Sequence, residues 1–146
     1  MFEYGKDGPR VVLVGVDGSE TSLRAAAYGA GLARRQHSRL VAVYVTPGVS
    51  GFAGMKAASA LGIKHANDQA EAEMRALADQ RAADLGVEYE FMRRYGDPYR
   101  EIVSVADELL ADAIVVGAST AVGHRFVGSL AIHLVRAGRW PVTVVP

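Results

Sequence analysis

The sequence predicts a single α/β domain built around a parallel β-sheet, and three observations support this fold class. Three runs, at residues 11–16, 40–45 and 113–116, are apolar throughout and rich in β-branched residues. Strands buried on both faces of a parallel sheet have this composition. Segments with helical spacing of apolar residues alternate with these runs. The length, 146 residues, is that of one ordinary domain, and the composition does not change along the chain.

The first strand and the first helix are the most clearly marked elements. The strand VVLVGV spans residues 11–16, and shortly after it Ser19 can cap a helix by accepting a hydrogen bond from a free backbone N–H. A second strand, LVAVYV, follows at residues 40–45. Residues 11–45 therefore form one βαβ unit, whose crossover we expect to be right-handed.

The middle of the chain is less regular. Residues 46–63 are rich in glycine and too long for an ordinary connection, so we predict a mobile or functional segment there. A second helix is predicted from about Ala66 to Gly86, which would end it in a left-handed conformation. Residues 87–92, VEYEFM, alternate apolar and acidic side chains, which indicates a strand at an edge of the sheet.

The C-terminal third completes a pattern of five strands and four helices, with no second domain or internal repeat. Its expected elements are a helix with Asp97 as N-cap and Pro98 as first residue, the strand at 113–116, a glycine-rich turn over 117–129, a helix from about Ser129 to Gly138, and a fifth strand at 141–145. The predicted architecture is an open, doubly wound sheet flanked by helices.

Composition and charge exclude several classes of protein. Sixteen basic and sixteen acidic side chains give a formal net charge of zero, so nothing favours a nucleic-acid partner or an anionic membrane surface. The chain contains no cysteine, which excludes disulfides, zinc ribbons and thiol catalysis. The first ten residues lack the apolar stretch of a signal peptide, and no run is long enough to span a membrane. We therefore expect a cytoplasmic protein.

Two turns form the candidate ligand site, because each follows a buried strand and leads towards a helix N-terminus. They are the turn from Asp17 to Ser19 and the turn over residues 117–129. Ligands of open parallel sheets bind beyond the carboxyl ends of the strands, and free N–H groups at a helix N-terminus favour phosphate. Two interpretations stay open for each turn. Asp17 either contacts a ligand or only stabilises the turn that begins the first helix. The glycine-rich turn either binds an anion or only forms a tight connection.

The common catalytic and nucleotide motifs are missing. The chain has no G-x-x-x-x-G-K-[ST] and no G-x-G-x-x-G after its first strand, so neither a P-loop nor a dinucleotide site is predicted. It has no G-x-S-x-G elbow, no recognisable pairing of a nucleophile with a base, and no His, Asp or Glu grouping at metal-ligand spacing. We expect no catalytic residues and no metal site.

Three segments of the sequence resemble the universal stress protein family: VVLVGVDGSETS near the start, ADAIVVGAS later, and GHRFVGSLAIHLVRAGRWPVTVVP at the end. They span almost the whole chain in the order that the family has, and the closing segment is the most specific. The resemblance implies an open five-stranded parallel sheet in the order 3-2-1-4-5, formed by residues 11–146 after a flexible tail at 1–10. It also implies a homodimer joined through the C-terminal strand, residues 141–145.

One branch of this family has an ATP site with the motif G-x2-G-x9-G-[ST] after the fourth strand. Gly117 matches the first glycine and Gly128-Ser129 match the last pair. Thr120 stands at the second glycine, the loop is two residues shorter than the motif, and Gly123 is the candidate to replace the missing glycine. The nucleotide-binding residues that the resemblance implies are Gly15, Asp17, Val45, Val116, Gly117, Thr120, Gly123, Gly128, Ser129 and Leu130. His124 and Arg125 lie in the turn itself, and their basic side chains are candidate phosphate contacts or, alternatively, part of a solvated basic face.

The resemblance implies a stress-response protein that binds an adenine nucleotide, ATP or another, and signals to an unidentified protein partner without strong catalysis. Mg²⁺ would accompany ATP only. The first alternative is a homodimeric interaction module that needs no nucleotide, and the second is a slow ATP hydrolase. The shortened loop predicts weaker binding and a shorter nucleotide, such as AMP or a cyclic form, because less backbone is available to surround three phosphates.

Overall fold

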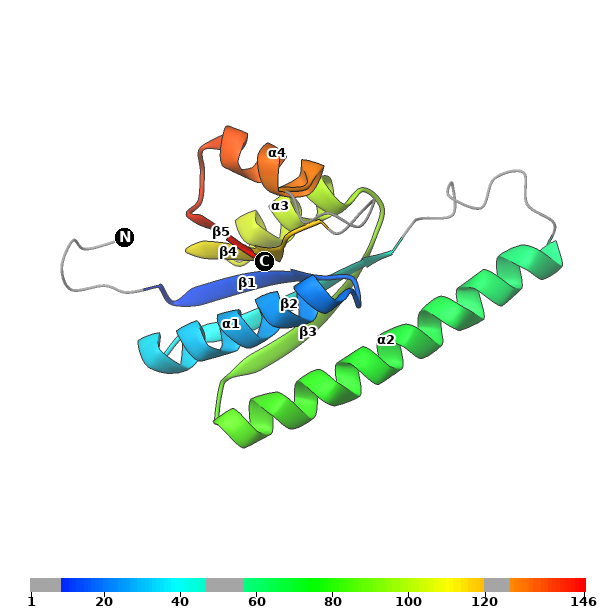
Figure 1. Ribbon diagram of the computed structural model, residues 1–146, viewed down its shortest axis with the longest axis horizontal. Helices are drawn as coiled ribbons and strands as arrows, with labels where there is room; N and C mark the ends of the chain where they lie inside the picture. Colours follow the sequence, from blue (N-terminus) through cyan, green and yellow to red (C-terminus); the bar gives the residue numbers. More distant parts are fainter. Residues whose placement is uncertain (1–8, 47–56, 120–126) are drawn as a thin grey trace.

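The computed structural model describes residues 9–46, 57–119 and 127–146, and within them five strands alternate with four helices (Figure 1). The elements are β1 (Val11–Val16), α1 (Glu20–Gln36), β2 (Arg39–Thr46), α2 (Ala57–Leu85), β3 (Tyr89–Tyr95), α3 (Pro98–Glu108), β4 (Ala113–Gly117), α4 (Ser129–Ala137) and β5 (Val142–Val145).

The five strands form one parallel sheet in the order β3-β2-β1-β4-β5. The predicted fold class and strand order are both confirmed. β1 lies between β2 and β4, so the winding direction of the sheet reverses beside β1. β3 is at an edge, as its alternating pattern indicated, but it runs on past residues 87–92 to Tyr95, because its pairing with β2 continues to Thr46.

Helices cover both faces of the sheet. α1 and α2 lie on one face, and α3 and α4 lie on the other (Figure 1). Successive residues of a strand point to opposite faces. Val12 of β1 therefore packs in the core that contains Met74 of α2, whereas Leu13 packs in the core that contains Ile102 of α3 and Leu134 of α4. This burial on two sides explains the continuous apolar runs of the central strands.

The helix ends agree with the sequence signals. Ser19 accepts a hydrogen bond from the N–H of Ser22 at 3.2 Å and caps α1, and Asp97 accepts one from the N–H of Arg100 at 3.0 Å and caps α3. Gly138 follows α4 with a φ of 64°, a left-handed conformation that favours glycine.

α2 differs most from the expectation. It begins at Ala57, well before the predicted start near Ala66, so residues 57–63 are helical rather than part of a loop. Residues 47–56 of the predicted mobile segment lie outside the described residues. Residues 61–66 of the helix are exposed, and without a buried face they carry no apolar stripe by which the sequence could indicate a helix.

The chain makes tertiary contacts before β1 begins. The carbonyl oxygen of Pro9 accepts a hydrogen bond from the hydroxyl of Ser38, and the carbonyl oxygen of Arg10 accepts one from the N–H of Arg39 at 2.9 Å. Residues 1–8 lie outside the described residues. The flexible tail expected at 1–10 stays a prediction.

Candidate functional site

A cleft of about 350 Å³ opens at the carboxyl ends of β1 and β4, beside the point where the winding of the sheet reverses. Open α/β sheets bind ligands at this position. One wall of the cleft is apolar and consists of Val43 and Val45 from β2, Ile102 from α3 and Val116 from β4. The cleft is also lined by hydroxyl groups, one carboxylate and the start of α4. An apolar wall with a few polar groups is the usual composition of a small-molecule site.

Two glycines let backbone segments approach closely around the cleft. A Cβ atom on Gly117 would lie 2.5 Å from the backbone carbon of Thr21, so glycine allows the first turn of α1 to lie against the end of β4. Thr21 reinforces this contact, since its hydroxyl donates a hydrogen bond to the carbonyl oxygen of Ala118 at 2.6 Å. A Cβ atom on Gly128 would lie 3.0 Å from the Cβ of Ser119. Gly117 therefore has a packing reason to be glycine, independent of any ligand.

Asp17 lies at the rim, in the turn between β1 and α1. Its Oδ1 accepts a hydrogen bond from the N–H of Ser19 at 2.8 Å, and its own N–H donates one to Oγ of Ser22 at 3.2 Å. Burial raises the pKa of Asp17, but the hydrogen bonds with Ser19 and Ser22 outweigh burial and hold the pKa below its ordinary value. Asp17 is therefore an ionised turn residue.

Replacing Asp17 by asparagine is expected to lower the free energy of unfolding by about 1 kcal/mol at neutral pH, because a charge-assisted hydrogen bond becomes a neutral one. Since the folded-state pKa of Asp17 is lowered, its contribution is fully present above the ordinary carboxyl pKa and is lost as the pH falls through the folded-state value. Urea unfolding of both proteins from neutral pH down to about pH 3 should give stability curves that converge at the acid end. Parallel curves would contradict the prediction.

The N-terminus of α4 opens onto the cleft without a capping side chain. Its N-cap is Gly128, and Ser129 and Leu130, the first two residues of the helix, line the cleft. The first N–H groups of a helix have no partner within the helix, and together with the helix dipole they attract anions. The N-termini of α1 and α3 are instead capped by Ser19 and Asp97. Among the described helices at this cleft, α4 is the one whose N-terminus is left for an anion.

The structure brings most of the predicted nucleotide-binding residues to this one cleft, as the strand order requires. Those that line it are Gly15, Asp17, Val45, Val116, Gly117, Gly128, Ser129 and Leu130. Thr120, Gly123, His124 and Arg125 lie outside the described residues. That any of these residues binds a nucleotide stays a prediction.

The cleft also contains residues that the sequence did not indicate. Val43 is separated from Val45 by one position, so the alternation along a strand places both on the same face, and this signal was present in the sequence. Pro98 and Ile102 line the cleft from α3. No local pattern marks these two residues as site residues, because they reach the cleft only when α3 packs across the strands.

The described residues contain neither a candidate metal site nor a candidate membrane-spanning helix. No group of three or more His, Asp or Glu side chains among them could hold a metal ion. No helix in the described part of the chain is both long enough and apolar enough to cross a membrane.

The fold and the cleft together define a doubly wound α/β ligand-binding domain, with an apolar pocket beside an open helix N-terminus. A model of the universal stress protein family matches residues 9–146. The chain belongs to this family, and the resemblance found in the sequence is confirmed.

Relatives match over nearly their full length. The universal stress protein MJ0531 of Methanocaldococcus jannaschii is 28% identical over 152 residues, which cover 99% of this chain and 86% of that protein. The structure of universal stress protein UspA from Lactobacillus plantarum matches with a TM-score of 0.77 and 26% identity, over 94% of this chain and 97% of that one. A family member from Burkholderia pseudomallei matches with a TM-score of 0.75 and 26% identity, over 93% and 95%.

Proposed function

We propose that the cleft binds an adenine nucleotide and that the protein acts by binding and signalling rather than by strong catalysis. The observation that carries the proposal is the uncapped N-terminus of α4, which lines the same cleft as a group of apolar residues. The wall formed by Val43 and Val45 suits the faces of a base, and the N–H groups of Ser129 and Leu130 suit a phosphate.

Solved structures of the same fold contain adenine nucleotides. They are a universal stress protein in complex with cAMP (TM-score 0.68, 24% identity), one from Archaeoglobus fulgidus in complex with dAMP (0.67, 23%) and one from Arabidopsis thaliana with AMP bound (0.69, 17%), which cover between 94% and 96% of this chain. Likeness at this level shows a shared fold. It makes the adenine nucleotide the ligand to test first in this chain.

The charges at the cleft favour a nucleotide with few phosphates. Among its described lining residues, Asp17 is the one charged side chain, and it is a carboxylate. Only uncharged donors, backbone N–H and hydroxyl groups, would therefore face the phosphates, unless His124 and Arg125, the candidate contacts outside the described residues, add positive charge. The short loop between Gly117 and Gly128 also favours a nucleotide with few phosphates. We therefore propose AMP or a cyclic form ahead of ATP, with Mg²⁺ accompanying ATP only.

Calorimetric titration of the purified protein with AMP, cyclic AMP, ADP and ATP tests the proposal. We expect AMP or cyclic AMP to bind more tightly than ATP. A mass spectrum of whatever the protein releases on denaturation identifies a ligand that is retained through purification. If none of the four nucleotides produces heat at millimolar concentration, about −4 kcal/mol of binding free energy, the nucleotide proposal is wrong. An interaction module without a nucleotide would then be the better proposal.

We propose further that the protein is a homodimer joined through β5. This strand is at an edge of the sheet, where unpaired backbone groups invite another chain. The carbonyl oxygens of Pro141 and Val145 accept hydrogen bonds from Ile114 in β4 and from Ala118 just after it, at 3.0 and 2.8 Å. Because backbone groups alternate along a strand, those of Val144 face the free edge.

Replacing Val144 by proline removes the N–H that faces the free edge, and proline is tolerated on an edge strand at such a position. Sedimentation should therefore show a dimer for the wild type and a monomer for Val144→Pro. Val144→Ala is the matched control, since it loses the same side chain but keeps the N–H and should remain a dimer. A Val144→Pro protein that sediments like the wild type would place the interface elsewhere.

A further inference from the structure

α2 has an unusually small apolar attachment to the rest of the domain. The helix is 29 residues long, yet the described side chains buried along it are those of Glu71, Met74 and Ala82. Larger apolar side chains face solvent, with Leu61 56% exposed and Leu77 43% exposed. Because a helix ordinarily docks through an apolar stripe, α2 needs another source of attachment.

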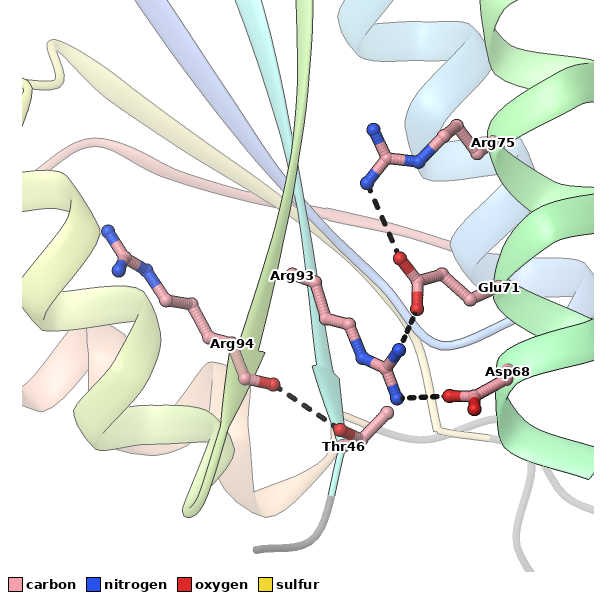
Figure 2. Close-up of polar contacts among 6 residues, drawn as sticks. All are labelled: Thr46, Asp68, Glu71, Arg75, Arg93 and Arg94. Atoms are coloured by element: carbon pink, nitrogen blue, oxygen red, sulfur yellow. Dashed lines mark hydrogen bonds and ion pairs between the residues drawn. The ribbon is translucent and has the colours of Figure 1, made fainter. Parts of the chain in front are cut away.

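An ion-pair cluster centred on Glu71 supplies this attachment (Figure 2). Oε2 of Glu71 lies 2.5 Å from Nη1 of Arg93 on β3, and Oε1 lies 3.3 Å from Nη2 of Arg75. Asp68, one turn earlier on the same face of α2, lies with Oδ1 2.8 Å from Nη2 of Arg93. The guanidinium group of Arg93 therefore joins two carboxylates of α2 to the edge strand of the sheet.

The central pair of this cluster is largely removed from water. The side chain of Glu71 is 11% exposed and that of Arg93 is 20% exposed. Without Glu71, the largely buried guanidinium group of Arg93 keeps only Asp68, whose side chain is 41% exposed, and this is more costly than losing a surface pair. The docking of this part of α2 therefore depends on Glu71 keeping its charge and its partner.

The same face of α2 supports the turn that carries Asp17. Met74 lies one turn after Glu71, and its Cε would be 3.3 Å from a Cβ atom placed on Gly18. Gly18 is the middle residue of the turn from Asp17 to Ser19, and both of these neighbours line the cleft. The contact of α2 with the sheet edge and its contact with the rim of the cleft are therefore parts of one docked surface.

The register of the sheet gives a second connection. Arg93 of β3 pairs with Tyr44 of β2, and Tyr44 pairs with Val16, the last residue of β1 before Asp17. Burial raises the pKa of Tyr44, the charge of Arg93 lowers it, and the charges of Glu71 and Asp17 raise it. The charges of the ion-pair cluster and the carboxylate of Asp17 at the cleft are thus close enough to shift the pKa of the same side chain, that of Tyr44.

We propose that Glu71 is a positioning residue for the cleft. Its pairing with Arg93 holds the middle of α2, including Met74, against the turn after β1, and this keeps Asp17 and Ser19 in place at the rim. Glu71 itself does not touch the ligand. The effect on ligand affinity rests on the proposed function, whereas the effect on docking is independent of it.

Hydrogen exchange of the ligand-free protein tests the docking. In Glu71→Gln, the amides of residues 61–76 and of the turn at 17–22 should exchange about 100-fold faster than in the wild type, while those of α3 and α4 stay unchanged. Glu73→Gln is the matched control, because this neighbouring carboxylate is exposed and, among the described residues, accepts a hydrogen bond only from Gln69, at 3.3 Å. The control should exchange like the wild type.

A paired substitution separates positioning from simple loss of stability. Glu71→Met combined with Arg93→Met removes both charges and leaves neither one buried alone, so exchange should return to within about threefold of the wild type. AMP affinity, measured by calorimetry, should fall about tenfold in Glu71→Gln and recover in the paired variant.

Two outcomes would overturn the inference: exchange in Glu71→Gln that matches the Glu73→Gln control, or an increase spread equally over all four helices. Failure of the wild type to bind any nucleotide, together with the expected exchange result, would overturn the proposed function and leave the docking role intact.

Discussion

Replacing Gly117 by alanine is expected to lower the free energy of unfolding by about 3 kcal/mol or more and to abolish ligand binding. The new methyl group would lie 2.5 Å from the backbone carbon and 2.6 Å from the carbonyl oxygen of Thr21. Neither atom belongs to a flexible side chain, so the first turn of α1 must move away from β4. This movement also breaks the hydrogen bond from Thr21 to Ala118. Urea unfolding followed by circular dichroism measures the loss.

Gly31→Ala is the matched control for this experiment. Gly31 lies inside α1, where the nearest atom to an added Cβ is the end of the Arg35 side chain at 4.0 Å. Alanine is a better helix former than glycine, so the free energy of unfolding of this variant should rise by up to about 1 kcal/mol. If Gly117→Ala is as stable as the wild type, the close contact between α1 and β4 does not explain this glycine.

Replacing Ser129 by proline is expected to weaken nucleotide binding about 10- to 100-fold while the fold is retained. Ser129 is the first residue of α4, a position where proline is favourable because its N–H has no partner within the helix. The preceding Gly128 has a φ of −71° and a ψ of 168°, which suits a residue before proline. The substitution therefore removes one N–H from the cleft, and a hydrogen bond to a charged group contributes about 1.5–3 kcal/mol.

Ser129→Ala is the control, because it loses the hydroxyl group but keeps the N–H. Calorimetry with AMP should give an affinity near that of the wild type for Ser129→Ala and a much lower one for Ser129→Pro. Equal affinities for the two variants would show that the N-terminus of α4 does not bind the phosphate. Gly128→Val is a less specific test, since its Cβ would already crowd the Cβ of Ser119 at 3.0 Å.

Much of the fold was predictable because it depends on short-range patterns. The central strands are buried on both faces and therefore contain almost nothing but apolar residues, as in VVLVGV at residues 11–16. Ser19 and Asp97 marked helix starts that the structure confirms, since a cap depends only on the next few residues. The predicted start of α2 was wrong by several residues, because residues 61–66 are exposed and have no buried face.

The candidate site was predictable only in part. The position of Asp17 and Gly117 at the same edge followed from the strand order, which the family resemblance implied and the structure confirms. Pro98 and Ile102 were not predicted as site residues, because they lie on α3, which reaches the cleft only by packing across the strands. The packing reason for Gly117 was also hidden, since a glycine in the sequence does not reveal which backbone lies beside it.

The sequence alone was sufficient for the fold class, the order of the elements and the family, because each depends on patterns that neighbouring residues or whole motifs carry. Only the tertiary structure decided how α2 is attached. Glu71 and Arg93 are far apart in the chain, and each looks like an ordinary surface charge until β3 and α2 come together. Burial of a charge depends on what packs over it, and that is a property of the assembled fold.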